Sequence, residues 1–520
     1  MSRLLRPAVL VPVAVVAALA AGTLVLLPED KPLVLQGIAA DTLNSRTLSK
    51  ALISVDTEGH LTTVLIDGAR VASASRGTVT APLKDLKDGT HTVTATVDRG
   101  FPRGTASTKR TVVVDITPPA LTVNPLTSPA RIKSPVVLSG TTDGAISSNG
   151  GQVVANGSGF TVRFPAPPLG GATITATDAA GNTTTKVVPI RTSYPNNIRA
   201  VHMTGAAWAY SGLRLPVMAL IKQHRINAVQ LDIKDEDGVV NYPTRVPLAG
   251  TIGARASYFQ AKATTDYLHR MGVRVIGRIV AFNDPKLSNW AVAHKHMDWV
   301  IQNPDGTKYL YGYNKTGFTN FASAQVRAYN EALAVEAVTL GFDDVVYDYV
   351  RRPDGPIANM RFPGLKGQPE DAIVRFLAET QAKIRPLGGS LGAAAFAQAS
   401  TRPKSTAQNI HKMAQHLDVV IPMDYPSHWN NGEYGVPDTY VGAYDIVRRS
   451  LVDWRKQVIG TGCVVVPWLQ DENYRGVYTP AKVMEQIQGA RDNGIPGWLM
   501  WSAGARYQAA AYTPDATPAR

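Results

Sequence analysis

The feature that most limits how this 520-residue chain can fold is a regular alternation of strand and helix patterns after Asn196. Short runs rich in apolar and β-branched residues alternate with longer helix-patterned segments. The strand patterns lie at 201–203, 227–233, 273–280, 391–396, 417–423, 458–466 and 497–501, with one more that ends near Asp348. Alternation of this kind between residues 196 and 510 predicts a (β/α)₈ barrel, or TIM barrel. A doubly wound open sheet is the alternative, but no Gly-x-Gly-x-x-Gly turn follows the first strand.

The first part of the chain has a different pattern, in which short strands alternate with turns. Residues 90–97 alternate polar and apolar side chains, and Asp88-Gly89 supplies a turn before them. Pro118-Pro119 interrupts the pattern, which then starts again. Two all-β sandwiches are therefore predicted, over 32–117 and 118–192. The Pro-Pro joint and the segment 176–183 resemble bacterial immunoglobulin-like (Ig-like) repeats, and this resemblance implies spacer or adhesion modules.

The extreme N-terminus has the pattern of a targeting segment. Arg3 and Arg6 precede an apolar stretch over residues 7–27. That stretch is about as long as the ~20 residues that cross a bilayer, and a small-residue cleavage site is also present within it. Residues 1–31 are therefore predicted to be a cleaved signal peptide or a signal anchor. In either case we expect an exported protein, either anchored in the membrane by this segment or secreted and associated with the cell wall.

Charge and cysteine content exclude several functions. The formal net charge is +13 and is spread along the chain without long Lys/Arg blocks. For an exported protein this favours contact with anionic cell-wall polymers or lipid head groups, and nucleic-acid binding is not expected. Cys463 is the only cysteine, so no intrachain disulfide or multi-thiolate metal site can form. Its apolar surroundings predict a small buried residue and not a nucleophile.

Polar and aromatic residues gather at the predicted C-terminal ends of the strands, where the active site of a TIM barrel opens. Asp348 comes at the end of the fourth strand, directly before Tyr349 and close to Arg351. The other strand ends contribute Asp232, Lys234, Asp235, Arg278, Asp424, Tyr425, His428, Trp468, Asp471, Trp498 and Trp501. Their common position predicts a cleft for a polar substrate.

The residue types in this cleft point to carbohydrate chemistry. Several carboxylates and aromatic residues are present, but no catalytic cysteine, Gly-x-Ser-x-Gly elbow or phosphate-binding loop. Hydrolysis of a glycosidic bond requires two carboxyl groups, and aromatic faces stack on sugar rings. We therefore predict Asp348 as the nucleophile or base and Asp424 as the general acid, with Asp232 in reserve. The remaining residues of the set are predicted to bind substrate, and no cofactor or metal is expected.

Each of these residues also has a structural interpretation. Asp348 could pair with Arg351, Asp232 with Lys234 or Arg278, and Asp424 could cap the turn at Tyr425-Pro426. His428 could make a loop hydrogen bond, and Trp468, Trp498 and Trp501 could be core aromatics. The acidic turn 235–238 lacks the distal Glu of a calcium loop and is read as a solvated turn.

The barrel half also resembles a known family. The segments that carry the likeness are 227–235, 303–306, 341–351, 423–428, 467–471 and 497–501. In this order they resemble the bacterial putative glycosyl hydrolase domain family, once described as a domain of unknown function. The resemblance implies a TIM barrel and glycoside hydrolysis, without naming a sugar. More loosely, Gly341-Phe342-Asp343 followed by Asp348 is similar to the fourth-strand segment of α-amylase-like enzymes, in which the equivalent Asp is the nucleophile.

Two positions depart from the family pattern. Relatives carry a carboxylate at the end of strand five, whereas residues 391–397 here contain none. The position before Tyr425 is apolar in relatives and is Asp424 here. Two functions are therefore open: hydrolysis of an extracellular or cell-wall polysaccharide, or glycan binding by a barrel that has lost catalysis. A metal-dependent deacetylase would need a His/Asp cluster that the sequence lacks. Residues 511–520 are predicted to be a C-terminal tail.

Overall fold

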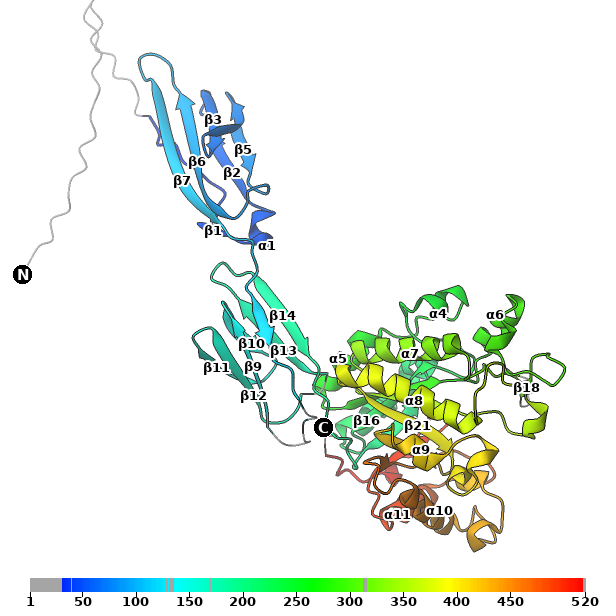
Figure 1. Ribbon diagram of the computed structural model, residues 1–520. Helices are drawn as coiled ribbons and strands as arrows, with labels where there is room; N and C mark the ends of the chain where they lie inside the picture. The colour runs from blue at the N-terminus through cyan, green and yellow to red at the C-terminus, as the bar shows by residue number, and fades with distance from the viewer. Residues whose placement is uncertain are drawn as a thin grey trace, which may run out of the picture.

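The structure, a computed structural model, describes residues 30–517 apart from 39, 128–129, 131–134, 169 and 312–315. Two all-β units precede a large barrel, and the first unit lies farthest from it (Figure 1). Residues 1–29 of the predicted targeting segment lie outside the described residues. Within the described residues, no helix has the length and apolarity needed to cross a bilayer.

The first unit spans residues 42–114 and contains two sheets. A five-stranded sheet has the order β1-β7-β6-β3-β4, and β2 pairs with β5 in a second sheet. The predicted alternation in β6 is confirmed, because Val93, Ala95 and Val97 are all buried. The elements are β1 (Thr42–Leu43), α1 (Ser45–Leu48), β2 (Leu52–Asp56), β3 (Leu61–Ile66), β4 (Ala69–Ala74), β5 (Thr78–Pro82), β6 (Gly89–Asp98) and β7 (Thr105–Val114).

The second unit spans residues 121–188 and also contains two sheets around one apolar core. The orders are β10-β13-β14 and β11-β12-β9-β8, and Leu138, Val162 and Ile174 lie in the core. The elements are β8 (Leu121–Val123), β9 (Val136–Thr142), β10 (Ala145–Ser148), β11 (Gln152–Asn156), β12 (Gly159–Phe164), β13 (Ala172–Thr177) and β14 (Thr183–Val188). The sheets agree with the predicted β-rich region, while the Ig-like resemblance stays a prediction.

A buried asparagine joins the two all-β units. Asn182 is 4% exposed and accepts a hydrogen bond from the backbone N–H of Ser45 at 3.2 Å. Its amide nitrogen donates to the backbone oxygen of Asp115 at 2.8 Å and to the carboxylate of Asp178 at 2.9 Å. The side chain therefore connects the first unit, the linker and the second unit.

We expect Asn182→Ala to loosen this joint without unfolding either core. The backbone groups that lose their partner cost about 1–3 kcal/mol. Small-angle X-ray scattering should show a broader distribution of lengths, and limited proteolysis should cleave faster near Thr117. Asn124→Ala, at an exposed asparagine of the second unit, is the matched control. Equal behaviour of the two variants would contradict a role for Asn182 in the joint.

The second part of the chain forms the predicted parallel β/α barrel. Its strands are β15 (Arg199–Met203), β16 (Ala228–Lys234), β17 (Arg274–Val280), β20 (Asp344–Asp348), β21 (Ser390–Phe396), β22 (Val419–Met423), β24 (Trp468–Gln470) and β25 (Trp498–Trp501). Each strand pairs in parallel with the next, and β25 closes the barrel against β15. The two-residue strand β23 (Val464–Val465) also pairs with β22.

Helices cover the outside of the barrel (Figure 1). The longer ones are α3 (Ser211–Lys222), α5 (Ala261–Arg270), α6 (Pro285–Ala293), α7 (Ala324–Thr339), α8 (Pro369–Ile384), α10 (Ala443–Gln457) and α11 (Pro480–Arg491). Shorter elements are α2 (Gly205–Ala209), α4 (Pro247–Thr251), α9 (Ile410–Ala414) and the pair β18 (Leu310–Tyr311) and β19 (Thr316–Gly317).

The predicted seventh strand is wrong in its bounds. Residues 458–461 form a turn after α10, and strand structure begins only at Val464. Pro467 then separates β23 from β24, since proline has no N–H to donate to the sheet. The apolar run 458–466 that suggested one long strand is therefore divided between a turn after α10 and the two-residue strand β23. Cys463 is buried there, as predicted.

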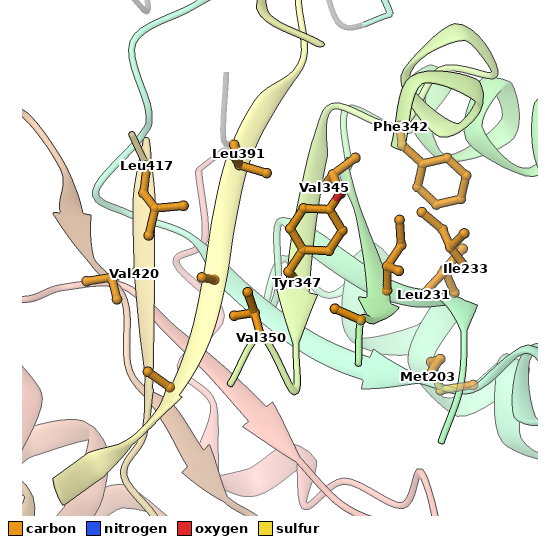
Figure 2. Close-up of a cluster of buried hydrophobic side chains, with 14 of the residues drawn as sticks. Met203, Leu231, Ile233, Phe342, Val345, Tyr347, Val350, Leu391, Leu417 and Val420 are labelled. Carbon is orange, nitrogen blue, oxygen red and sulfur yellow. The ribbon is translucent and has the colours of Figure 1, made fainter. Parts of the chain in front are cut away.

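Alternation along the strands separates two apolar layers. Ala200, Ala228, Val346 and Leu499 belong to a cluster inside the barrel, made mostly of strand residues. The intervening residues face the helices, and Figure 2 shows several of them, among them Leu231, Val345, Tyr347, Leu391 and Val420. Side chains that face the barrel interior recur at every second residue of a strand. A residue at a strand end therefore faces the barrel opening only if it continues that inward-facing series.

The C-terminal segment 511–517, predicted to be a tail, packs on the barrel. Tyr512 is 1% exposed and lies against Trp498, with ring centroids 4.9 Å apart. Asp515 pairs with Arg199, and the backbone oxygen of Thr517 accepts from Asn227 at 2.8 Å. The packed structure thus extends beyond the predicted domain boundary at residue 510.

Candidate active site

A cavity of about 320 Å³ opens at the C-terminal ends of the strands. Eight of its lining residues belong to the predicted site: Arg278, Asp348, Tyr349, Arg351, Tyr425, His428, Trp468 and Trp501. Four further lining residues were not predicted: Glu236, Phe396, Gln398 and Met423. The barrel topology brings these residues together from segments far apart in the sequence.

Arg278 on β17 connects the carboxylates of the site. Its side chain is 3% exposed and donates to Asp348 Oδ2 from Nε at 3.0 Å and from Nη2 at 2.7 Å. The same Nη2 donates to Glu236 Oε1, and Nη1 donates to Asp232 Oδ1 at 3.0 Å. Burial of a guanidinium is costly unless charged partners surround it, and here three carboxylates do. These carboxylates hold the pKa of Arg278 well above its ordinary value, although burial acts in the opposite direction.

Asp348 is held at the end of β20 in a fixed orientation. Its Oδ1 accepts from the backbone N–H of the next residue, Tyr349, at 2.7 Å, while Oδ2 faces Arg278. Tyr349 has φ +50°, a left-handed conformation that is uncommon outside glycine. Backbone strain of this kind is found where the surrounding structure fixes a functional side chain.

Aromatic rings form much of the remaining wall. Tyr425 stacks on Trp501 with ring centroids 5.3 Å apart and contacts His428 edge-on at 5.1 Å. Burial, with a smaller effect of Arg475, lowers the pKa of His428, which favours the neutral ring. Burial raises the pKa of Tyr349 to about 12. Of the three predicted tryptophans, Trp468 and Trp501 line the cavity.

Asp232 lies beside the cavity and not in its lining. It is fully buried, accepts from Arg278, and lies 2.9 Å from Nε2 of His202 on the neighbouring strand β15. Burial acts to raise its pKa, but the nearby His202 and Arg278 together lower the pKa below its ordinary value. The structural interpretation of an ion pair with Arg278 is therefore confirmed, and Asp232 is placed to orient that guanidinium.

The structure does not bring Asp424 into the cavity. Its inner-layer neighbours Met423 and Tyr425 line the cavity, whereas Asp424 points toward α10. There it accepts from Trp429 Nε1 at 2.9 Å and from Ser450 Oγ at 2.7 Å. Burial raises the pKa of Asp424 to about 7. The reason for the mismatch is strand alternation, since adjacent residues face opposite sides of the barrel wall.

Lys234 and Asp235 also lie away from the cavity. The register between β16 and β17 shifts between Asp232 and Lys234, which turns Lys234 toward the helices. There its ammonium pairs with Asp284 at 2.6 Å and is fully buried. Asp235 accepts from the backbone N–H of Val239 at 2.9 Å within a turn, and burial raises its pKa to about 6.

Asp471 and Trp498 face the outside of the barrel as well. Asp471 accepts from the hydroxyl of Tyr512 and from the backbone N–H of Gln508 at 2.9 Å. Trp498 packs on the same Tyr512. Both residues therefore hold the C-terminal segment on the barrel, where the sequence-based expectation was substrate binding.

Glu236 is the functional candidate that sequence reasoning missed. It lies two residues beyond β16, and its side chain is 46% exposed. The sequence predicts a solvated turn at 235–238, and Glu236 is indeed partly in solvent. The missed signal was its position just past a strand end, on the face where the other site residues gather. Among the described residues, no group of three or more His, Cys, Asp or Glu side chains is arranged to hold a metal ion.

Comparison with known proteins relates the barrel to a family. A family model described as a putative glycosyl hydrolase domain matches residues 200–507, and no curated protein matches the chain. A hypothetical protein from Ruminiclostridium thermocellum ATCC 27405 is 28% identical over 37% of this chain and 96% of its own, with a TM-score of 0.33. The PgaB (BpsB) glycoside hydrolase domain from Bordetella bronchiseptica is 12% identical over 59% and 94%, with a TM-score of 0.45. The spore cortex-lytic enzyme SleL from Bacillus cereus is 11% identical over 64% and 78%, with a TM-score of 0.37.

Proposed function

Because the chain belongs to the putative glycosyl hydrolase domain family, we propose that its barrel hydrolyses glycosidic bonds with Asp348 and Glu236 as the two carboxyl groups. The observation that carries the proposal is their common contact with Arg278. Among the described residues, they are the two carboxylic acids that line the cavity, and both accept a hydrogen bond from Nη2 of that arginine. Glu236 thus replaces Asp424 as the partner of Asp348.

The spacing of the two carboxylates supports a retaining reaction. Two oxygens that are hydrogen-bonded to one nitrogen are separated by no more than about 6 Å at normal hydrogen-bond lengths. Retaining glycosidases have carboxyl groups about 5–5.5 Å apart, whereas inverting ones leave about 6.5–9.5 Å for a water molecule. The shorter spacing requires one carboxylate to attack the sugar directly.

The surroundings of the two groups assign their roles. Asp348 is 4% exposed and held by two residues, which suits a nucleophile that must meet the anomeric carbon in one geometry. Glu236 is 46% exposed and lies on a loop, which suits a group that exchanges protons with water. In the first step Asp348 bonds to the anomeric carbon while Glu236 protonates the departing oxygen. In the second step Glu236 takes a proton from water, whose oxygen attacks the anomeric carbon and releases Asp348.

We expect Glu236→Gln to slow the cleavage of substrates with poor leaving groups much more than the cleavage of activated substrates. A general acid contributes about 10²- to 10⁴-fold, but a 4-nitrophenolate leaves without protonation. The rate of formation of the glycosyl-enzyme should therefore stay near wild type for 4-nitrophenyl glycosides and fall for oligosaccharides, measured by rapid-quench kinetics. Asp235→Asn, at the adjacent carboxylate outside the cavity, is the control. Equal losses on both kinds of substrate would contradict the acid role.

The substrate we propose is an extracellular or cell-wall polysaccharide. Support comes from the targeting pattern at the N-terminus and from the net charge of +13, which favours anionic polymers. The two all-β units would then act as spacers between the cell surface and the barrel. Fractionation of cells that express the full chain, with detection in membrane, wall and medium, tests this location.

A second function is favoured by one observation at strand β21. This strand ends in Phe396, and the cavity wall there is completed by Gln398, so no carboxylate comes from it. A barrel without that group could bind glycans and release no product. Saturable binding of a polysaccharide, with no oligosaccharide detected by mass spectrometry, would favour this function over hydrolysis.

A further inference from the structure

Arg351 forms part of the cavity wall and has unusual surroundings. Its side chain is 2% exposed, yet it lines the cavity together with Asp348 and Arg278. Four aromatic rings surround the guanidinium carbon at 4.3–5.6 Å from their centroids: Phe396, Tyr349, Tyr311 and Phe318. Such rings attract a cation and at the same time keep water away from it.

The charge of Arg351 is balanced much less than that of Arg278. Within the described residues, its ion pair is with Asp354 at 3.6 Å, and that carboxylate is 48% exposed. Its further hydrogen bonds go to neutral groups, the backbone oxygen of Arg352 at 2.9 Å and the hydroxyl of Tyr311 at 3.4 Å. Arg278, by contrast, contacts three carboxylates. A buried cation with such weak compensation is ready to accept an anion from a ligand.

We propose that Arg351 forms a subsite for a sugar that carries an acidic group, a carboxylate or a phosphate, in the cavity that holds Asp348. The inference rests on the proposed function, since it names the class of sugar that the hydrolase would take. The planar guanidinium offers parallel N–H groups that match the oxygens of either anion. Its low exposure strengthens the attraction, because the surrounding rings lower the local polarity.

The position of the subsite couples recognition to the proposed chemistry. Arg351 follows Asp348 by three residues, on the loop that leaves β20, and Tyr349 between them lines the same cavity. An acidic group on Arg351 would therefore hold its sugar ring next to the carboxylate pair. A neutral sugar of the same shape would fill the cavity but leave the arginine without its partner.

The test is direct binding of three sugars to the full-length protein by isothermal titration calorimetry. The probes are D-glucuronate, D-glucose 6-phosphate and D-glucose. We expect at least one acidic sugar to bind about 10- to 100-fold more tightly than glucose, the range for a hydrogen bond to a charged group. A preference for glucuronate identifies carboxylate as the recognised group, and a preference for the phosphate identifies that group.

Substitutions connect the preference to Arg351. Arg351→Gln should remove the preference for the acidic sugar over glucose. Arg402→Gln, which removes one positive charge from a side chain that is 52% exposed and outside the cavity, should keep it. Equal affinity of the three sugars for wild type, or a preference that survives in folded Arg351→Gln, would overturn the proposal. If that variant does not fold, raising the salt from about 0.05 to 0.5 M should weaken the preference in wild type, and a salt-independent preference would overturn it.

Binding and turnover separate this inference from the proposed function. Preferential binding of an acidic sugar, with no oligosaccharide released from any polysaccharide tested, would support the subsite and refute hydrolysis. Hydrolysis of neutral glycosides by a protein that shows no preference for acidic sugars would refute the subsite alone.

Discussion

Asp348→Asn is expected to lower kcat by about 10⁴-fold or more while the barrel stays folded. Removing one member of a catalytic set costs on the order of 10⁴- to 10⁶-fold in hydrolases. Asparagine has nearly the same shape, and Arg278 keeps Asp232 and Glu236 as partners. Activity should be measured on a panel of α- and β-linked polysaccharides, with oligosaccharide products detected by mass spectrometry. A variant with unchanged activity would rule out Asp348 as the nucleophile.

The matched control for this experiment is Asp424→Asn. It makes the same substitution at a second buried aspartate next to a strand end, but outside the cavity lining. Its turnover should stay close to wild type. A further readout follows from the retaining mechanism, since a 2-deoxy-2-fluoro glycosyl fluoride should label the peptide that contains Asp348 with one sugar. Label on another carboxylate would reassign the nucleophile.

The second large effect concerns stability and Asp424. Burial raises its pKa to about 7 in the folded chain, against an ordinary value of 3.8 for a free side chain. Between these two values the folded state binds more protons than the unfolded state, so stability falls as the pH rises. The difference between the two pKa values corresponds to about 4 kcal/mol of folding stability. This stability is fully present below pH 4 and lost above pH 7.

Asp424→Asn should therefore gain stability relative to wild type as the pH rises from 4 to 8. The amide can still accept from Trp429 and can donate to Ser450, so both contacts persist without a charge. Urea unfolding followed by tryptophan fluorescence measures the free energy of unfolding at each pH, because all eight tryptophans lie in the barrel. A stability difference that does not change with pH would contradict the buried protonated carboxyl. A loss of turnover as large as that of Asp348→Asn would restore Asp424 as a catalytic candidate.

Local pattern was sufficient to predict most of the cavity. Asp348, Tyr349 and Arg351 were identified because they follow a β-branched strand, and Tyr425, His428 and Trp468 for the same reason. In a parallel barrel all strands end at the same side, so a strand end already specifies proximity to the site. The position along the chain was therefore enough to select the right segments.

Two of the misplaced residues share one physical cause: Asp424 and Asp471 lie just past strand ends, but on the face that meets the helices. Trp498 also faces outward, and it is the first residue of β25, at the end of the strand away from the cavity. The sequence does not show which alternate residues of a strand face the barrel interior, because both faces of a barrel strand are buried and apolar. Lys234 adds a second difficulty, since a register shift after Asp232 reverses its direction.

The sequence by itself determined the order of the parts, the parallel barrel and the side on which its chemistry gathers, because these depend on local periodicity and on the direction of the chain. Only the tertiary structure decided which carboxylates face each other. Glu236 and Asp348 are separated by more than a hundred residues, and they meet only through Arg278 on the strand between theirs. Their pairing depends on strand register and side-chain direction, which result from packing the whole barrel.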